Sequence, residues 1–227
     1  MYLLYKDKTI TVVIPCLNEE EAIGKVLDDV PDFVENVIVV DNNSTDRTPD
    51  IAREMGATVI QETVRGYGRA YKTGFSKATG DIIVTLDGDH SYPVHDLQRV
   101  LDIFFQYDVH FLSCCRFPVM DADAMSFKHW IGNQVLSLVM SILYKTPIED
   151  SQSGMWVFYR DILDKIRLRS DGMPLSEEIK IEAIRNKDIR FKEEHIKYSA
   201  RSGEIKLRPW RDGMRNLLFL FRKRLFP

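Results

Sequence analysis

Short apolar segments alternate with amphipathic segments along the first half of the chain. Four β-branched or aliphatic runs are predicted to be buried strands, because each is short and ends at a polar or turn-forming residue. They cover residues 10–14, 37–40, 57–60 and 81–86. Apolar residues at helical spacing lie between them, over residues 20–30, 45–55 and 67–78. Strands that alternate with helices in this way predict an α/β fold with a mostly parallel central sheet and helices on both faces.

The second half of the chain is less regular. Its pattern predicts helices over residues 127–144 and 176–186, and strands over residues 155–159 and 196–199. No repeat or low-complexity linker separates this half from the first. We therefore expect the second half to extend the same sheet.

Length and composition place the chain among ordinary globular proteins. At 227 residues it corresponds to one large domain, or one domain with an appendage. The 44% hydrophobic and 29% charged residues are enough for a sizeable core. A formal charge of -3 argues against a protein that coats nucleic acid along its surface, so we expect no nucleic-acid partner.

The charge is unevenly distributed along the chain. Residues 201–227 carry a net charge of +6, which leaves -9 on the first 200 residues. The C-terminal residues 211–227 are predicted to form a basic amphipathic helix, since apolar residues recur there at helical spacing: Met214, Leu217, Leu218, Phe221 and Leu225. Such a helix fits the surface of an anionic cytoplasmic leaflet. The apolar helix at 127–144 suits either the core or a membrane interface.

Three further features of the sequence bear on where in the cell the protein is located. No window approaches the roughly 18 uninterrupted apolar residues of a membrane span. The first eight residues lack the pattern of a signal peptide. Cys16, Cys114 and Cys115 form an odd set without zinc-type spacing, which fits a reducing cytosol. We expect a peripheral, monotopic protein without a transmembrane span.

Polar side chains follow three of the predicted strands. Ligands of open parallel sheets bind at the carboxyl ends of the strands. The three clusters are Asn18-Glu19-Glu20, Asp41-Asn42-Asn43-Ser44-Thr45-Asp46 and Asp87-Gly88-Asp89. Carboxylates gathered at one edge would repel each other unless a cation lay among them, which favours Mg²⁺ or Mn²⁺ held by Asp87 and Asp89. Each cluster alone is also compatible with a turn or a helix cap.

The order of these motifs resembles the family-2 inverting glycosyltransferases, and within them the polyprenyl-phosphate (dolichyl-phosphate) sugar synthases. The residues that carry the resemblance are Val13 to Glu20, Val39 to Asp46, Gly66-Tyr67-Gly68-Arg69-Ala70, Leu86 to Asp89, Asp150 to Met155 and Arg201 to Leu207. The resemblance implies a GT-A glycosyltransferase domain over residues 1–210. Its nucleotide-binding half spans about residues 9–115 and its acceptor half about residues 116–210.

The resemblance also implies roles for single residues. Pro15, Asn18 and Glu20 are expected to border the nucleoside, and Asp41 to hold the base or ribose. Asp87 and Gly88 are expected to bind the nucleotide, with Asp87 on the ribose or the metal, and Asp89 to be the principal metal ligand and a catalytic residue. Two positions depart from the family pattern: Ser91 stands where a Gln is frequent, and Ile205 where a Ser is usual.

The acceptor decides the expected mechanism. An alcohol nucleophile needs a general base, for which Asp150 is the candidate. A lipid monophosphate, with a second pKa of about 6, is already ionised and needs none. Orientation and charge neutralisation then dominate, and Arg116, Arg201 and Lys206 are expected to hold the acceptor phosphate.

The sequence therefore predicts inverting transfer of one sugar from a UDP- or GDP-linked donor to a polyprenyl or dolichyl phosphate. The site is expected at the cytoplasmic membrane face, and the product is a lipid-phosphate sugar for glycan or glycoprotein assembly. Two alternatives stay open: a soluble family-2 enzyme that glycosylates a sugar or protein hydroxyl, and a non-catalytic nucleotide-sugar-binding module. Glucose, N-acetylglucosamine and mannose remain equally compatible.

Overall fold

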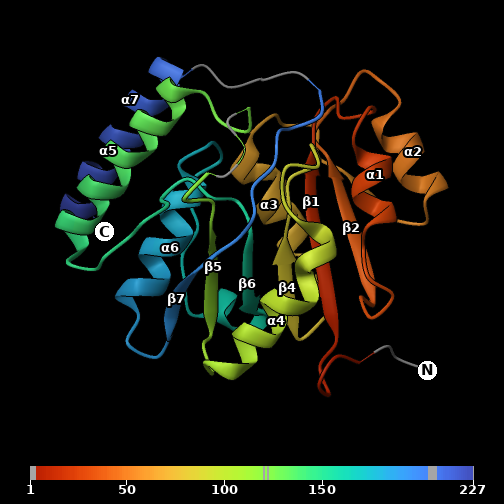
Figure 1. The fold of residues 1–227 in the computed structure, drawn as a ribbon, viewed down its shortest axis with the longest axis horizontal. Helices are drawn as coiled ribbons and strands as arrows, with labels where there is room; N and C mark the ends of the chain where they lie inside the picture. The colour runs from red at the N-terminus through yellow and green to blue at the C-terminus, as the bar shows by residue number, and fades with distance from the viewer. Residues whose placement is uncertain (1–3, 120, 122, 204–208, 227) are drawn as a thin grey trace.

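The computed structural model describes residues 4–119, 121, 123–203 and 209–226. A seven-stranded sheet in the order β3-β2-β1-β4-β6-β5-β7 forms its centre (Figure 1). The strands are β1 (Ile10–Cys16), β2 (Asn36–Asp41), β3 (Thr58–Gln61), β4 (Ile82–Thr85), β5 (Phe111–Cys115), β6 (Trp156–Tyr159) and β7 (Phe191–His195). Only β6 runs antiparallel to its neighbours β4 and β5. The predicted α/β fold with a mostly parallel sheet is confirmed.

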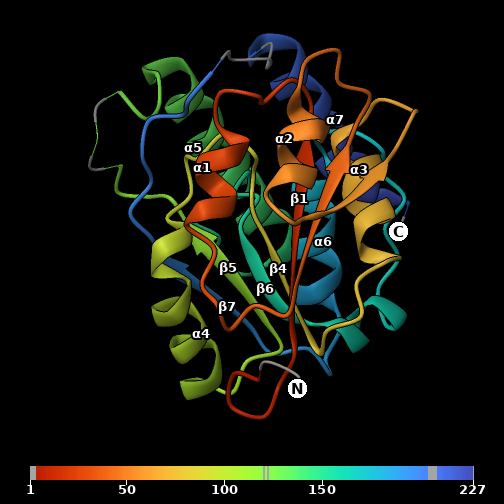
Figure 2. The same ribbon diagram turned by 90° about the vertical axis from the view of Figure 1, so that its right-hand side faces the viewer.

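Helices cover both faces of this sheet (Figure 2). They are α1 (Ile23–Asp28), α2 (Thr48–Glu54), α3 (Tyr67–Phe75), α4 (Leu97–Gln106), α5 (Phe127–Tyr144), α6 (Leu175–Arg185) and α7 (Pro209–Leu225), with short 3-10 turns at Val94–Asp96 and Arg160–Asp164. Alternate residues of a strand point to opposite faces. Val12 and Ile14 accordingly pack into the core under α1, α2 and α4, whereas Val13 packs into the core under α3 and α6.

A third, smaller core joins the helices of the second half. Leu136 and Met140 of α5, Ile181 of α6 and Leu220 of α7 are buried together. Figure 1 shows α5 and α7 lying side by side, away from the sheet. The C-terminal helix predicted at 211–227 is thus observed as α7, beginning at Pro209.

One predicted strand is wrong. Residues 196–199 are not a strand, and β7 lies just before them at Phe191–His195. Ile196 is buried and looks like a strand residue, but it belongs to a segment that leaves the sheet toward Ser91, where the Ser199 N–H donates to the Ser91 carbonyl. The hydrophobic pattern does not reveal β7, because this strand lies at the edge of the sheet, pairs only with β5 and is largely charged.

Candidate active site

The loops after β1 and β2 are tied to each other by the side chains of Asn18 and Glu20. Asn18 Oδ1 accepts a hydrogen bond from the Thr45 N–H (2.8 Å), and Glu20 Oε2 accepts one from the Arg47 N–H (3.0 Å). Asn18 has a positive φ of 54°, a conformation in which Asn is among the better-tolerated residues. Pro15 lies beside them, half-buried in β1. These residues therefore shape the edge where the sequence predicts the nucleoside.

A second set of hydrogen bonds extends this edge toward α3. The Asp41 carboxylate is buried and accepts from the Ser44 N–H (3.1 Å). Asn42, for which the sequence predicts no individual role, donates from Nδ2 to the Val64 carbonyl (2.8 Å) and accepts from the Gly66 N–H (2.7 Å). Its side chain thus connects the end of β2 to the start of α3.

Asp87 sits at the end of β4 in a crowded, polar pocket. Tyr71 Oη donates to Asp87 Oδ1 (3.3 Å), and Tyr67 Oη lies 3.5 Å from the same oxygen. Burial, together with the negative charge of Asp89, raises the pKa of Asp87 to about 7. A Cβ on Gly88 would lie 2.6 Å from Cys16 Sγ, so only glycine allows this loop to approach β1 so closely.

Asp89 is 7% exposed, and its carboxylate lies near the guanidinium of Arg201. Its Oδ1 accepts from the N–H (3.0 Å) and the hydroxyl (2.5 Å) of Ser91. Arg201 Nη1 lies 3.6 Å from Asp89 Oδ2, and Arg201 Nη2 lies 3.3 Å from Glu19 Oε1. Arg201 is therefore at the predicted metal site, although its motif predicts a contact with the acceptor phosphate.

Arg116, which follows β5, and Asp150, in the loop before β6, form a bidentate ion pair. Arg116 Nε lies 2.7 Å from Asp150 Oδ2, and Arg116 Nη2 lies 2.8 Å from Asp150 Oδ1. Asn133 Nδ2 on α5 also donates to Oδ1 (2.7 Å). Burial alone would raise the pKa of Asp150, but the adjoining Arg116 guanidinium holds it well below its usual range. Such a carboxylate is a weak proton acceptor, which disfavours Asp150 as a general base.

The loop from Ser151 to Gly154 brings this ion pair next to Asp87. Thr85 Oγ1 at the end of β4 donates to the Gly154 carbonyl (2.7 Å), and the Gly154 N–H donates to Tyr92 Oη (2.7 Å). A Cβ on Gly154 would lie 2.3 Å from Tyr67 Oη and 3.2 Å from Asp87 Oδ1. The predicted donor and acceptor motifs therefore share one wall. Lys206, the remaining predicted phosphate ligand, lies outside the described residues, as does Ile205.

Two groups of side chains are candidates for a metal. Asp87 and Asp89, with the Ser91 hydroxyl, offer oxygen ligands, which Mg²⁺ and Mn²⁺ prefer. Burial and the neighbouring Asp89 carboxylate both disfavour the ionised form of Asp87, and a divalent cation between the two carboxylates would stabilise it. These residues fit the predicted cation.

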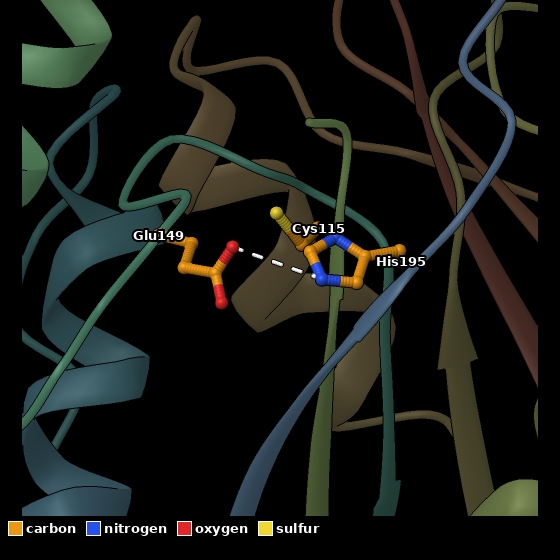
Figure 3. Close-up of side chains that lie close together, drawn as sticks. All are labelled: Cys115, Glu149 and His195. Carbon is orange, nitrogen blue, oxygen red and sulfur yellow. Dashed lines mark ion pairs between the residues drawn. The ribbon is translucent and has the colours of Figure 1, made fainter. Parts of the chain in front are cut away.

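The second group is a mixed cluster at the ends of β5 and β7, Cys115, Glu149 and His195 (Figure 3). Glu149 Oε2 lies 3.7 Å from His195 Nε2. His195 Nδ1 is hydrogen-bonded to the Phe117 carbonyl. Burial raises the pKa of the Cys115 thiol to about 12, which disfavours the thiolate that metal binding requires. This cluster does not suit Mg²⁺ or Mn²⁺.

Beyond the site, α5 and α7 expose an unusual amount of apolar surface. Leu138 and Leu218 are 61% and 62% exposed. The other large exposed apolar side chains on the two helices are Phe127, Trp130, Ile131, Val135, Ile142, Met214, Phe221 and Leu225. They alternate at helical spacing with the buried positions, so each helix presents one outward apolar stripe. Among the residues described, no helix combines the length and apolar character needed to cross a bilayer.

The family comparison agrees with the motif order. The model of "Glycosyl transferase family 2" matches residues 11–167. Two Haloferax volcanii proteins are similar over almost the whole chain. The low-salt glycan biosynthesis hexosyltransferase Agl6 is 34% identical over 93% of this chain, which spans only 53% of that relative. The dolichyl-phosphate hexose transferase is 35% identical over 92% of this chain and 91% of its own length.

The solved structures show the same fold. Glucosyl-3-phosphoglycerate synthase from Mycobacterium tuberculosis, in complex with Mn²⁺, UDP and phosphoglyceric acid, superposes with a TM-score of 0.78. The match covers 97% of this chain and 80% of that one, at 20% identity. The predicted GT-A fold is confirmed.

Proposed function

The chain belongs to glycosyl transferase family 2 and is a glycosyltransferase, and from this premise we propose that it transfers one sugar, with inversion, from a nucleotide-sugar to a polyprenyl or dolichyl phosphate. The transfer takes place at the cytoplasmic face of a membrane, to which the protein attaches from one side. The name of the Haloferax volcanii dolichyl-phosphate hexose transferase, similar over nearly its full length, supports this acceptor class.

The observation that carries the proposal is the double role of α5. Its outward face bears the exposed stripe that includes Leu138, while Asn133 on its inward face donates to Asp150 (2.7 Å). One helix therefore reaches from an apolar outer surface to the acceptor loop. An exposed apolar helix face is stabilised when it leaves water for the lipid boundary, which would bring a lipid-borne phosphate to the site.

The chemistry of Asp150 favours a phosphate acceptor over a hydroxyl. A hydroxyl must lose a proton during attack, but the Asp150 carboxylate already accepts hydrogen bonds from Arg116 and Asn133. An ionised phosphate needs no base. Asp150 then acts as a positioning residue that orients the guanidinium of Arg116. Among the described residues Arg116 Nη1 has no hydrogen-bond partner, which leaves it free to contact a phosphate oxygen.

The donor side follows from the edge formed by β1, β2 and β4. Asp41, with Pro15, Asn18 and Glu20 around it, holds the nucleoside, and Asp87 with Gly88 contacts the ribose and diphosphate. Asp87 and Asp89 would hold Mg²⁺ or Mn²⁺, which neutralises the charge of the leaving nucleoside diphosphate. Similar folds have been solved with either ion. Arg201, beside Asp89, contributes a further positive charge where the acceptor phosphate meets the donor.

A direct assay tests the proposal. Full-length protein is incubated with Mn²⁺, labelled UDP-glucose, UDP-N-acetylglucosamine or GDP-mannose, and either polyprenyl phosphate or the matching polyprenol. We expect lipid product from the phosphate with at least one donor. The Asp89→Asn variant should lower the rate at least about 100-fold. The matched control Asp161→Asn, at an exposed carboxylate paired with Lys165, should retain the wild-type rate. Transfer to polyprenol but not to polyprenyl phosphate would refute the acceptor.

A further inference from the structure

A basic and apolar groove lies between the start of α3, the loop before α6 and the outer side of α7. It encloses a cavity of about 860 Å³. The lining includes Arg65, the segment around Asp171, and Arg211, Met214, Arg215, Leu218 and Arg222 of α7. The two helices that border it can be followed in Figure 2. None of the residues assigned to the donor or acceptor lines this groove.

The groove has an excess of positive charge. Within the part of the chain that the structure describes, none of its four guanidinium groups forms an ion pair with a carboxylate; Arg65 donates only to the Asn43 carbonyl (3.4 Å). The nearby Asp171 carboxylate is already paired with Lys72 (2.7 Å). Four like charges around one cavity repel each other and create a strong local potential for an anion. Arginine in such numbers is typical of phosphate recognition.

The same groove has an apolar side. Met214 and Leu218 are 58% and 62% exposed and belong to the outward stripe of α7. A small inorganic anion would leave these side chains in water. A phosphate that carries an alkyl chain would instead cover them while its headgroup meets the arginines.

We infer that this groove binds the phosphate headgroup of an anionic membrane lipid, with the first part of an acyl chain along Met214 and Leu218. The inference rests on the proposed attachment to a membrane. It adds a discrete lipid site to that attachment, separate from the acceptor site at Arg116 and Asp150.

The wall opposite α7 is formed by closely packed backbone. A Cβ on Gly66 would lie 2.3 Å from the Asp171 carbonyl oxygen, and a Cβ on Gly68 would lie 2.4 Å from that of Ser170. The Arg69 N–H donates to the Asp171 carbonyl (3.0 Å). The two glycines therefore let the backbone before α6 pack directly on the first turn of α3, next to Arg65.

The effect of replacing Arg65 distinguishes a discrete lipid site from a helix that is merely basic. Arg65 lies far from α7 in sequence, but it lines the same groove as the arginines of α7. Arg222 and Arg224 provide a matched pair on α7, since both are exposed but only Arg222 lines the groove. If the lipid binds in the groove, Arg65 and Arg222 matter and Arg224 does not. If α7 only lies on a charged surface, Arg222 and Arg224 are equivalent and Arg65 has no effect.

The experiment measures binding to full-length wild type and to the single variants Arg65→Gln, Arg222→Gln and Arg224→Gln. The probes are inorganic phosphate, short-chain phosphatidylglycerol below its micelle concentration, and phosphatidylcholine vesicles with and without phosphatidylglycerol. We expect the short-chain lipid to bind wild type more tightly than phosphate does. Arg65→Gln and Arg222→Gln should each weaken this binding about tenfold, the loss expected for one hydrogen bond to a charged group. Arg224→Gln should stay within about twofold of wild type.

Three results would overturn the inference. Equal affinity for phosphate and short-chain lipid would mean a simple anion site. Equal losses for Arg222→Gln and Arg224→Gln, with none for Arg65→Gln, would mean a non-specific basic surface. Binding to phosphatidylcholine vesicles that does not depend on phosphatidylglycerol would mean that no headgroup is recognised. Sugar transfer to a polyprenyl phosphate is assayed separately, so failure here leaves the proposed reaction standing.

Discussion

Replacement of Asp150 by Asn tests whether this carboxylate positions Arg116 or acts as a base. The two charges are almost fully withdrawn from water, with side-chain exposures of 0% for Asp150 and 11% for Arg116. The variant leaves the Arg116 cation in place and removes its counter-charge. An uncompensated charge in such a setting is costly, because neither solvent nor a partner offsets its desolvation.

The expected loss of stability can be estimated from these contacts. Removing one partner of a buried ion pair typically costs about 3 to 5 kcal/mol. The Asn carbonyl can still accept one hydrogen bond, from Arg116 or from Asn133, so we expect the lower end, about 3 kcal/mol. For a chain of this size that corresponds to a fall in Tm of roughly 10 °C. Because Arg116 lowers the pKa of Asp150, this contribution is present above the ordinary carboxyl pKa and lost only as pH falls through the lowered value.

The assay is thermal and urea unfolding of wild type, Asp150→Asn, Arg116→Gln and the double variant. The double variant should be more stable than the sum of the single losses predicts by at least about 1 kcal/mol, because it leaves neither charge unpaired. The stability loss of Asp150→Asn should be the same at pH 6 and pH 8. An Asp150→Asn variant that unfolds within about 2 °C of wild type but has lost its activity would refute the positioning role.

Three further predictions use other parts of the molecule. Asp87, whose pKa burial and Asp89 raise to about 7, must be ionised to bind a cation, so affinity for Mn²⁺-UDP measured by calorimetry should rise roughly tenfold between pH 6 and pH 8; a flat profile contradicts this. The double variant Leu138→Gln/Leu218→Gln should bind vesicles at least about tenfold more weakly in a co-sedimentation assay and keep its Tm within about 2 °C of wild type. Unchanged vesicle binding would mean that these exposed stripes do not contact lipid. Burial raises the pKa of Glu177 well above its usual value, so the contribution of this group to stability falls as pH rises above the ordinary carboxyl pKa. Glu177→Gln should therefore raise Tm at pH 8 more than at pH 5, and an equal change at both contradicts it.

The strands β1 and β4 could be predicted because they are buried on both faces. β1 and β4 contain Val and Ile in nearly unbroken runs, and every residue of β4 is buried. The far edge of the sheet could not be predicted in this way. β7 reads Phe-Lys-Glu-Glu-His, with no buried residue, and takes its place only through pairing with β5. Such a strand is specified by its partner and not by its own pattern.

The candidate site divides in a similar way. Asp87 and Asp89 could be predicted as neighbours because only Gly88 separates them in sequence and both follow a strand of the sheet. Arg116 and Asp150 are 34 residues apart, and Arg201 and Glu19 are 182 apart, so no local spacing links either pair. The sequence therefore identified these residues singly, Asp150 and Arg201 through motif resemblance and Arg116 as a phosphate-binding cation. Their pairing depends on how β5, β6 and the C-terminal segment are arranged.

The arrangement of charge around the first turn of α3 joins these findings. On one side of this turn, Tyr67 approaches Asp87, where carboxylates are in excess and a cation is favoured. On the other side, Arg65 and the arginines of α7 are in excess, and an anion is favoured. A net charge of -3 gives no sign of either, because the two excesses largely cancel in the sum. They lie on different sides of the turn, because neither Asp87 nor Asp89 lines the groove that contains the arginines. Each side can therefore attract a ligand of opposite charge, which is what the proposed transfer between a metal-bound nucleotide and an anionic membrane would require.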